Sequence, residues 1–203
     1  MSEDDPDDEI SRILIQGSEF ERLRLVGGVF TGLSLRRKVR LHGLALVALS
    51  LVYPIALVLS PAVGRLFPGP RPALGSPNVV VLGCFAALTQ IFGGTVTWLV
   101  DRRLARADPD AVTARRLVAL ESIGSVIGFG TGGIAAALTV GFFLVNLAGI
   151  GTAQALENAL AGARGPYAPS RIAVSVRAFG VAAFVSGLCL LAAARRMTES
   201  PSR

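Results

Sequence analysis

The residues of this chain that could take part in catalysis or metal binding are few and far apart. Histidine occurs once, at His42, and the only cysteines are Cys84 and Cys189. Zinc sites and dithiol redox pairs need several such residues at short spacings, which this sequence lacks. It also has no G-x-S-x-G motif, no phosphate-binding loop and no catalytic cluster of paired carboxylates. We therefore predict that the protein is not an enzyme and has no catalytic residue, metal or cofactor.

Three polar residues fall inside long apolar runs and are candidates for a role within a membrane: Gln90, Asn146 and Arg177. Gln90 lies near the middle of its run, where an amide needs a hydrogen-bonding partner from another helix. The alternative is that it lines a transport pathway. Arg177 is close enough to the end of its run to reach the lipid headgroups. Because no run has an ionisable residue at its centre, coupled transport is not expected.

Three further residues are expected at a membrane surface. Trp98 ends an apolar run, at the depth where tryptophan anchors a helix in the interface. Glu121 lies at the start of the next run, and we expect it to pair with the arginines of the preceding connection, Arg102, Arg103 and Arg106. His42 opens the first run and is expected among the headgroups.

The elements that must position these residues are membrane spans. Of the 203 residues 52% are hydrophobic and 17% charged, and the mean hydropathy is +0.58, as in integral membrane proteins. Four runs reach the length of about 20 apolar residues that crosses a bilayer. The sequence therefore predicts an all-α membrane protein, a bundle of four transmembrane helices. The predicted segments are a disordered acidic tail at 1–9, a cytosolic N-terminal segment at 10–40, a membrane domain at 41–194 with spans 41–60, 79–100, 120–150 and 172–194, and a cytosolic tail at 195–203.

Small residues recur on one face of the third span. Gly124, Gly128, Gly132 and Ala136 are spaced four residues apart, so on a helix they share a face that another backbone can approach closely. The pair Gly93 and Gly94 offers a similar surface on the second span. This glycine-zipper pattern predicts close helix packing, either within the bundle or between copies of the protein.

The third helix is predicted to be longer than a membrane is thick. Asp108, Pro109 and Asp110 form a helix start, with Asp108 as N-cap and Pro109 at the first helical position. From Pro109 to Gly149 a helix would measure about 60 Å, roughly twice the hydrocarbon thickness. It must either project from the membrane or break, most naturally within the glycine cluster at 128–133.

The N-terminal segment has a five-residue period. Large apolar residues stand at every fifth position: Ile10, Ile15, Phe20, Leu25, Phe30 and Leu35. This pattern resembles the pentapeptide-repeat family, in which such residues fill a square β-solenoid. That family has a small residue two positions before each central one, which only Ser18 and Gly28 match. The alternative is a short helix near 8–15, followed by a loop or hairpin that turns at Gly27–Gly28.

The distribution of positive charge predicts the orientation. Lysines and arginines number seven up to Arg40, five between the second and third runs and three in the C-terminal tail. The other two connections have two each, with Arg177 just after the second of them. The positive-inside rule then places both termini in the cytosol. We expect a multi-pass protein of the plasma membrane without a signal peptide, because the first nine residues carry six acids and no base.

The charge and composition also bound the function. The net charge of +6 does not indicate nucleic-acid binding, since the basic residues lie at the ends of apolar runs. The expected partners are the lipid bilayer and either further copies of the chain or a membrane partner protein. The leading hypothesis is a non-catalytic accessory, assembly or scaffold subunit that acts through helix packing. The alternative is a small homo-oligomeric channel or facilitator lined by the glycine-rich third helix.

Overall fold

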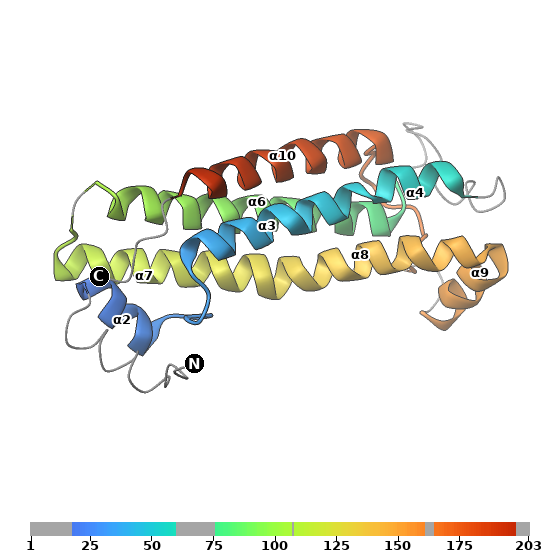
Figure 1. Ribbon diagram of the computed structural model, residues 1–203. Helices are drawn as coiled ribbons and strands as arrows, with labels where there is room; N and C mark the ends of the chain where they lie inside the picture. The colour runs from blue at the N-terminus through green and yellow to red at the C-terminus, as the bar shows by residue number, and fades with distance from the viewer. Residues whose placement is uncertain (1–17, 60–75, 107, 161–164, 198–203) are drawn as a thin grey trace, which may run out of the picture.

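A computed structural model shows long helices packed side by side (Figure 1). It describes residues 18–59, 76–106, 108–160 and 165–197. Among these residues four helical stretches are long and apolar enough to cross a membrane, and there is no strand; the stretches are Leu35–Val58, Asn78–Leu104, Ala111–Ala148 and Val176–Arg196. The predicted all-α bundle of four helices is therefore confirmed. The predicted acidic tail at 1–9 lies outside the described residues.

The first span consists of two helices, α3 (Leu35–Ser50) and α4 (Val52–Val58). The helical hydrogen-bonding pattern is interrupted between them, at Leu51, because Pro54 has no N–H to bond the Ser50 carbonyl four residues earlier. The span begins before its predicted start at residue 41. The Ser34 hydroxyl accepts a hydrogen bond from the Arg37 N–H and starts the helix there, so the basic residues at 36–40 belong to α3.

The second and third spans are longer. The second is α6 (Asn78–Leu104). The third is continuous over 38 residues, about 57 Å at the helical rise, and comprises α7 (Ala111–Ser125), the π-helix η1 (Val126–Gly132), α8 (Gly133–Val145) and the 3-10 turn η2 (Asn146–Ala148). The helix does not break at its glycine cluster but changes there to the wider π hydrogen-bonding pattern.

The start of the third span differs from the prediction by two residues. Asp110, and not Asp108, is the N-cap, since its side chain accepts a hydrogen bond from the Thr113 N–H at 2.9 Å. Hydrogen bonds from the Thr113 side chain and from its backbone N–H favour the charged carboxylate and hold the pKa of Asp110 below its ordinary value. After the third span the chain forms a further short helix, α9 (Ile150–Ala159).

The last span, α10 (Val176–Arg196), begins four residues after its predicted start at Ile172. The chain before it is held extended because it pairs with the residues that precede α6. The Ser76 N–H donates to the Ile172 carbonyl at 2.7 Å, and the Asn78 N–H donates to the Ala168 carbonyl at 3.0 Å. Two connections distant in sequence are thereby joined at one end of the bundle.

The described part of the N-terminal segment is a helix followed by turns. The helix α2 (Glu19–Gly27) begins with a capping box in which Ser18 and Glu21 bond each other's backbone N–H groups. The solenoid prediction is therefore wrong from residue 18 onward. The alternative is wrong for 19–27, where it placed a loop and α2 forms, but α2 ends at the predicted turning point, Gly27–Gly28. Its predicted helix near 8–15 lies outside the described residues. The capping box at Ser18 and Glu21 favours a helix in this stretch, whereas the five-residue period of apolar residues does not determine its structure.

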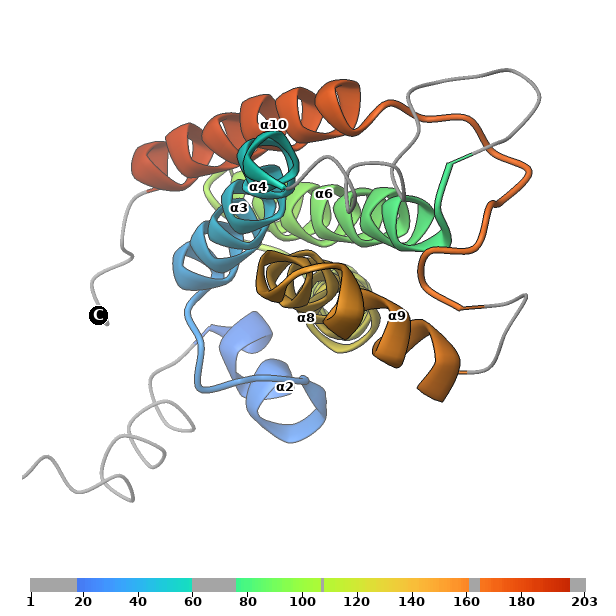
Figure 2. The same cartoon turned by 90° about the vertical axis from the view of Figure 1, so that its right-hand side faces the viewer.

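The bundle is organised around α6, which contacts α3, α10 and the third span. The end-on view in Figure 2 shows α6 between α10 on one side and α8 on the other, with α3 and α4 beside it. α2 packs against α7. We call the end of the bundle at which α2 lies the α2 end, and the opposite end, with α9, the α9 end (Figure 1).

Candidate functional site: a buried ion cluster

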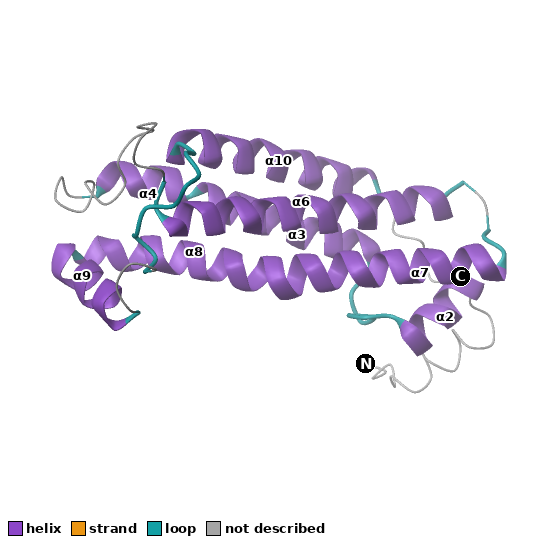
Figure 3. Ribbon diagram, turned by 180° about the vertical axis from the view of Figure 1, so that it is seen from behind, coloured by secondary structure: helices purple, strands orange, loops and turns teal. Residues whose placement is uncertain are grey.

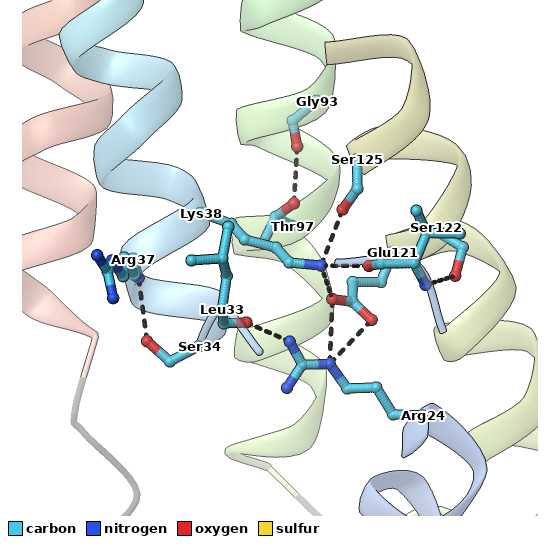
Figure 4. Close-up of polar contacts among 11 residues, drawn as sticks. Arg24, Leu33, Ser34, Arg37, Lys38, Gly93, Thr97, Glu121, Ser122 and Ser125 are labelled. Carbon is cyan, nitrogen blue, oxygen red and sulfur yellow. Dashed lines mark hydrogen bonds and ion pairs between the residues drawn. The ribbon is translucent and has the colours of Figure 1, made fainter. Parts of the chain in front are cut away.

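Lys38 and Glu121 form a buried ion pair between α3 and α7. The Lys38 ammonium lies 2.5 Å from the Glu121 carboxylate, and both side chains are fully inaccessible to solvent. The ammonium also donates to the Ser125 hydroxyl at 3.1 Å and to the Val29 carbonyl at 2.9 Å. Its three N–H donors therefore have three acceptors. Figure 4 shows these contacts converging on the ammonium.

Arg24 adds a second cation from α2. Its Nε lies 3.1 Å and 3.2 Å from the two oxygens of Glu121, and one terminal nitrogen donates to the Leu33 carbonyl (Figure 4). Its side chain is 16% exposed. We call Arg24, Lys38, Glu121 and Ser125 the ion cluster. Since its members come from α2, α3 and α7, it joins the N-terminal segment to two spans.

Local sequence explains why the cluster can assemble. Glu121 and Ser125 are four residues apart and lie on one face of α7. Lys38 lies in the first turn of α3, and its side chain contacts Glu121 and Ser125 on that face of α7. α2 is held nearby by Phe20, which packs into an apolar cluster whose buried members also include Val100, Ala114, Leu117 and Val118. The apolar contact of α2 thus brings Arg24 within reach of Glu121.

A second polar contact lies deeper in the bundle. His42 is one turn beyond Lys38 on α3, and its Nδ1 lies 2.5 Å from the Gln90 Oε1. The Gln90 amide nitrogen in turn donates to the Gly128 carbonyl, within the π-helix, at 2.9 Å. With the amide in this orientation the His42 Nδ1 carries the donated proton. The other ring nitrogen, Nε2, is buried and has no hydrogen-bond partner among the described residues.

The imidazole of His42 packs against the π-helix. The ring stacks on Phe129, with centroids 4.1 Å apart and planes 9° apart. The ring also packs against the backbone of Gly93 and Gly128. A Cβ added at Gly93 would lie 2.8 Å from the ring, and one added at Gly128 would clash with it. Phe30 of the N-terminal segment contacts Phe129 edge-on at 5.6 Å. The segment therefore reaches beyond the ion cluster to the level of the π-helix.

The structure places the small-residue face of the third span inside the bundle. Gly124, Gly128, Gly132 and Ala136 are all buried. Gly124 packs on Val96 of α6, and the Gly124 carbonyl lies 2.7 Å from where a Cβ on Gly93 would stand. Gly94 packs against Leu190 and His42, and Gly132 packs against Thr89 and Gln90. These glycines therefore contact helices of the same chain.

The other predicted polar residues are dispersed. Gln90 is buried at the middle of α6 and binds α3 and the third span. Asn146 is buried in η2 at the α9 end. Arg177 is the second residue of α10 and is exposed, so it lies at the end of its span and not inside it. Trp98 lies beneath the Arg102 guanidinium, 5.0 Å from the ring centroid.

Two expectations about charged residues are corrected. Glu121 is bonded to Lys38 and Arg24 instead of Arg102, Arg103 or Arg106. His42 does not lie at the edge of the fold, because its partner Gln90 is near the middle of α6. The signal available in the sequence was a pair of matching spacings, since Lys38 and His42, like Glu121 and Ser125, are four residues apart.

Metal-binding groups do not gather in the described part of the chain. No group of three or more histidine, cysteine, aspartate or glutamate side chains lies close enough there to hold a metal ion. Cys84 and Cys189 are free thiols on α6 and α10. Searches of protein-family models, curated proteins and solved structures found no match to this chain.

Proposed function

We propose that this protein is a non-catalytic scaffold or assembly subunit, in which four spans anchor a rigid N-terminal segment for docking to a membrane partner. The observation that carries the proposal is the ion cluster. Glu121 is bonded to one cation from α3 and to another from α2. The opposite charges of the ion cluster therefore attract one another, and the contact between Arg24 and Glu121 holds α2 against the bundle.

The attachment of the N-terminal segment is extensive enough to make it rigid. Lys38 bonds the Val29 carbonyl and Arg24 bonds the Leu33 carbonyl, so both ends of the turn region after α2 are tied to the cluster. Phe20, four residues before Arg24 and so on the same face of α2, is buried against α7. The same segment leaves Val26 84% and Phe30 46% exposed. A fixed backbone with apolar side chains facing outward is suited to docking a partner, because little conformational entropy is lost on binding.

The proposed location is the plasma membrane, with both termini and the α2 end in the cytosol. This orientation rests on the excess of positive charge at that end. Single cysteines introduced by Glu19→Cys and Arg171→Cys into a C84A/C189A background test it with a membrane-impermeant maleimide. We expect the cysteine at 171 to react in intact cells and the one at 19 to react only after permeabilisation. The opposite result would overturn the orientation.

The scaffold proposal is tested by photo-crosslinking in native membranes. A photoreactive residue at Val26 should give one discrete crosslinked protein, identified by mass spectrometry. The matched control is the same residue at Leu188, which is 46% exposed on α10 and should crosslink mainly to lipid. A pattern at Val26 no different from that at Leu188 would refute docking through the N-terminal segment.

One observation favours a second function, that of a small channel or facilitator. His42 presents an unbonded Nε2 at the level of the middle of α6, and buried ionisable groups in spans commonly mark ion or proton pathways. The pathway would follow His42 and Gln90 inside one chain, since the glycine face contacts the chain's own helices. Proteoliposomes separate the two functions. The scaffold proposal expects no selective flux, whereas proton flux that His42→Ala abolishes would establish the second function.

A further inference from the structure

A groove with basic residues at one end opens between α6 and α7 at the α2 end. It has a volume of about 420 Å³, and its lining includes Leu99, Leu117 and Leu120 together with Arg102, Arg103 and Arg106. The two helices that form it lie side by side and are joined by the short connection after α6 (Figure 3). The groove is distinct from the ion cluster, which uses Glu121 and the N-terminal segment.

The lining changes in character along α6. Val96 and Leu99 precede the arginines, and Leu99 and Leu120 are about half exposed, at 53% and 48%. Arg102 and Arg103 occupy the last turn of the helix. Val96 lies seven residues, about 10 Å of helix, before Arg103. The groove is thus apolar toward the middle of the span and cationic toward its end.

Trp98 marks the level at which this change occurs. Its ring lies 5.0 Å from the Arg102 guanidinium carbon. Tryptophan and arginine in this arrangement are typical of the depth at which lipid headgroups meet acyl chains. Three arginines and no acidic residue line the groove, so its mouth has an excess of positive charge. By contrast, a groove of about 610 Å³ between α6 and α8 at the α9 end has no charged residue in its lining.

We infer that the groove between α6 and α7 binds one anionic phospholipid. An acyl chain lies against the leucines, and the phosphate lies between the guanidinium groups of Arg102, Arg103 and Arg106. Guanidinium groups bind phosphate oxygens in paired, charge-assisted hydrogen bonds, and basic pockets between spans are suited to anionic headgroups. A zwitterionic lipid would fill the apolar part equally well but would bring its own cation to the arginines. Selectivity therefore depends on the three arginines.

The single tryptophan of the chain allows a direct test, since Trp98 lines the groove. The full-length protein is reconstituted in phosphatidylcholine vesicles that contain phosphatidylglycerol, with bromine on the acyl chains of one lipid or the other. We expect each molecule of brominated phosphatidylglycerol to quench the fluorescence of Trp98 about fivefold more than each molecule of brominated phosphatidylcholine. A factor of about five corresponds to the attraction of about one surface arginine for an anionic lipid. Replacing Arg102, which lies over the ring, can change the fluorescence intensity of Trp98 itself. The ratio of the two quenching values is used because such a change affects both values equally.

Three variants make the result specific. The triple variant R102Q/R103Q/R106Q should lose the preference, and R102K/R103K/R106K should retain most of it. The matched control R115Q/R195Q/R196Q removes three exposed arginines from outside the groove and should retain it. Equal quenching by both lipids in the unmodified protein would overturn the inference and favour an acidic protein segment as the occupant. Loss of the preference in the control would also overturn it, since the selectivity would then come from diffuse surface charge.

Discussion

Glu121→Gln should destabilise the bundle more than any change to an exposed acid. The carboxylate is fully buried and is the anion that faces both Lys38 and Arg24. A glutamine keeps the shape and one hydrogen-bond acceptor but removes the negative charge. Lys38, which has no access to solvent, would then be a buried ammonium beside a second cation.

The expected loss follows from the burial of the pair. Removing one partner of a buried ion pair generally costs about 3–5 kcal/mol, because the remaining charge stays desolvated. For a chain of about 200 residues this corresponds to a fall in Tm of roughly 6–20 °C. Arg24 contributes less to the loss, since its side chain is 16% exposed and can turn toward water.

Thermal unfolding in detergent micelles, followed by the fluorescence of Trp98, measures this effect. The matched control is Asp108→Asn, at an exposed acid, which should change Tm by no more than about 2 °C. The double variant K38M/E121L should recover most of the lost stability, because replacing both partners by apolar groups is often neutral. An E121Q protein as stable as the D108N control would refute the assignment of Lys38 and Glu121 as a buried pair.

Three further outcomes are expected. Gly128→Ala, which places a methyl group against the buried imidazole, should lower stability by about 1–3 kcal/mol, whereas Gly141→Ala, where the space is open, should not; the same thermal assay compares them. The carboxyl of Asp110 has a lowered pKa owing to its bonds with Thr113, so its cap stabilises the helix above the ordinary pKa of 3.8 and is lost as pH falls through the lower folded value. Over that range the protection of the Thr113 amide, the slowing of its exchange relative to that of an unfolded chain, should fall, and in Asp110→Ala it should be low throughout. Burial raises the pKa of the Tyr167 hydroxyl, so stability should decline as pH rises above 10 and through the higher folded value, and Tyr167→Phe should remove this decline in alkaline unfolding measurements.

The number and nature of the spans could be predicted from sequence because they depend on composition along the chain. Runs of apolar residues long enough for a bilayer must be helical, since every backbone group has to be bonded within the span. The boundaries were less accurate. α3 begins early at the Ser34 cap and α10 begins late at Ser175, because local caps and the pairing of 76–78 with 168–172 decide them, and hydropathy does not detect either.

The ion cluster could not be derived in the same way. Glu121, Lys38 and Arg24 lie on three helices, and their meeting depends on how α2 and α3 pack on α7. A basic run at the edge of a span predicts exposed charges, yet one of its members, Lys38, is buried because α7 and the turn after α2 enclose its ammonium group. The sequence by itself thus determined that there are four apolar helices with charged ends, since hydrophobicity and length act locally along the chain. Only the tertiary structure decided which charges are buried together and which glycines face His42, because those contacts join residues that are distant in sequence and depend on the packing of whole helices.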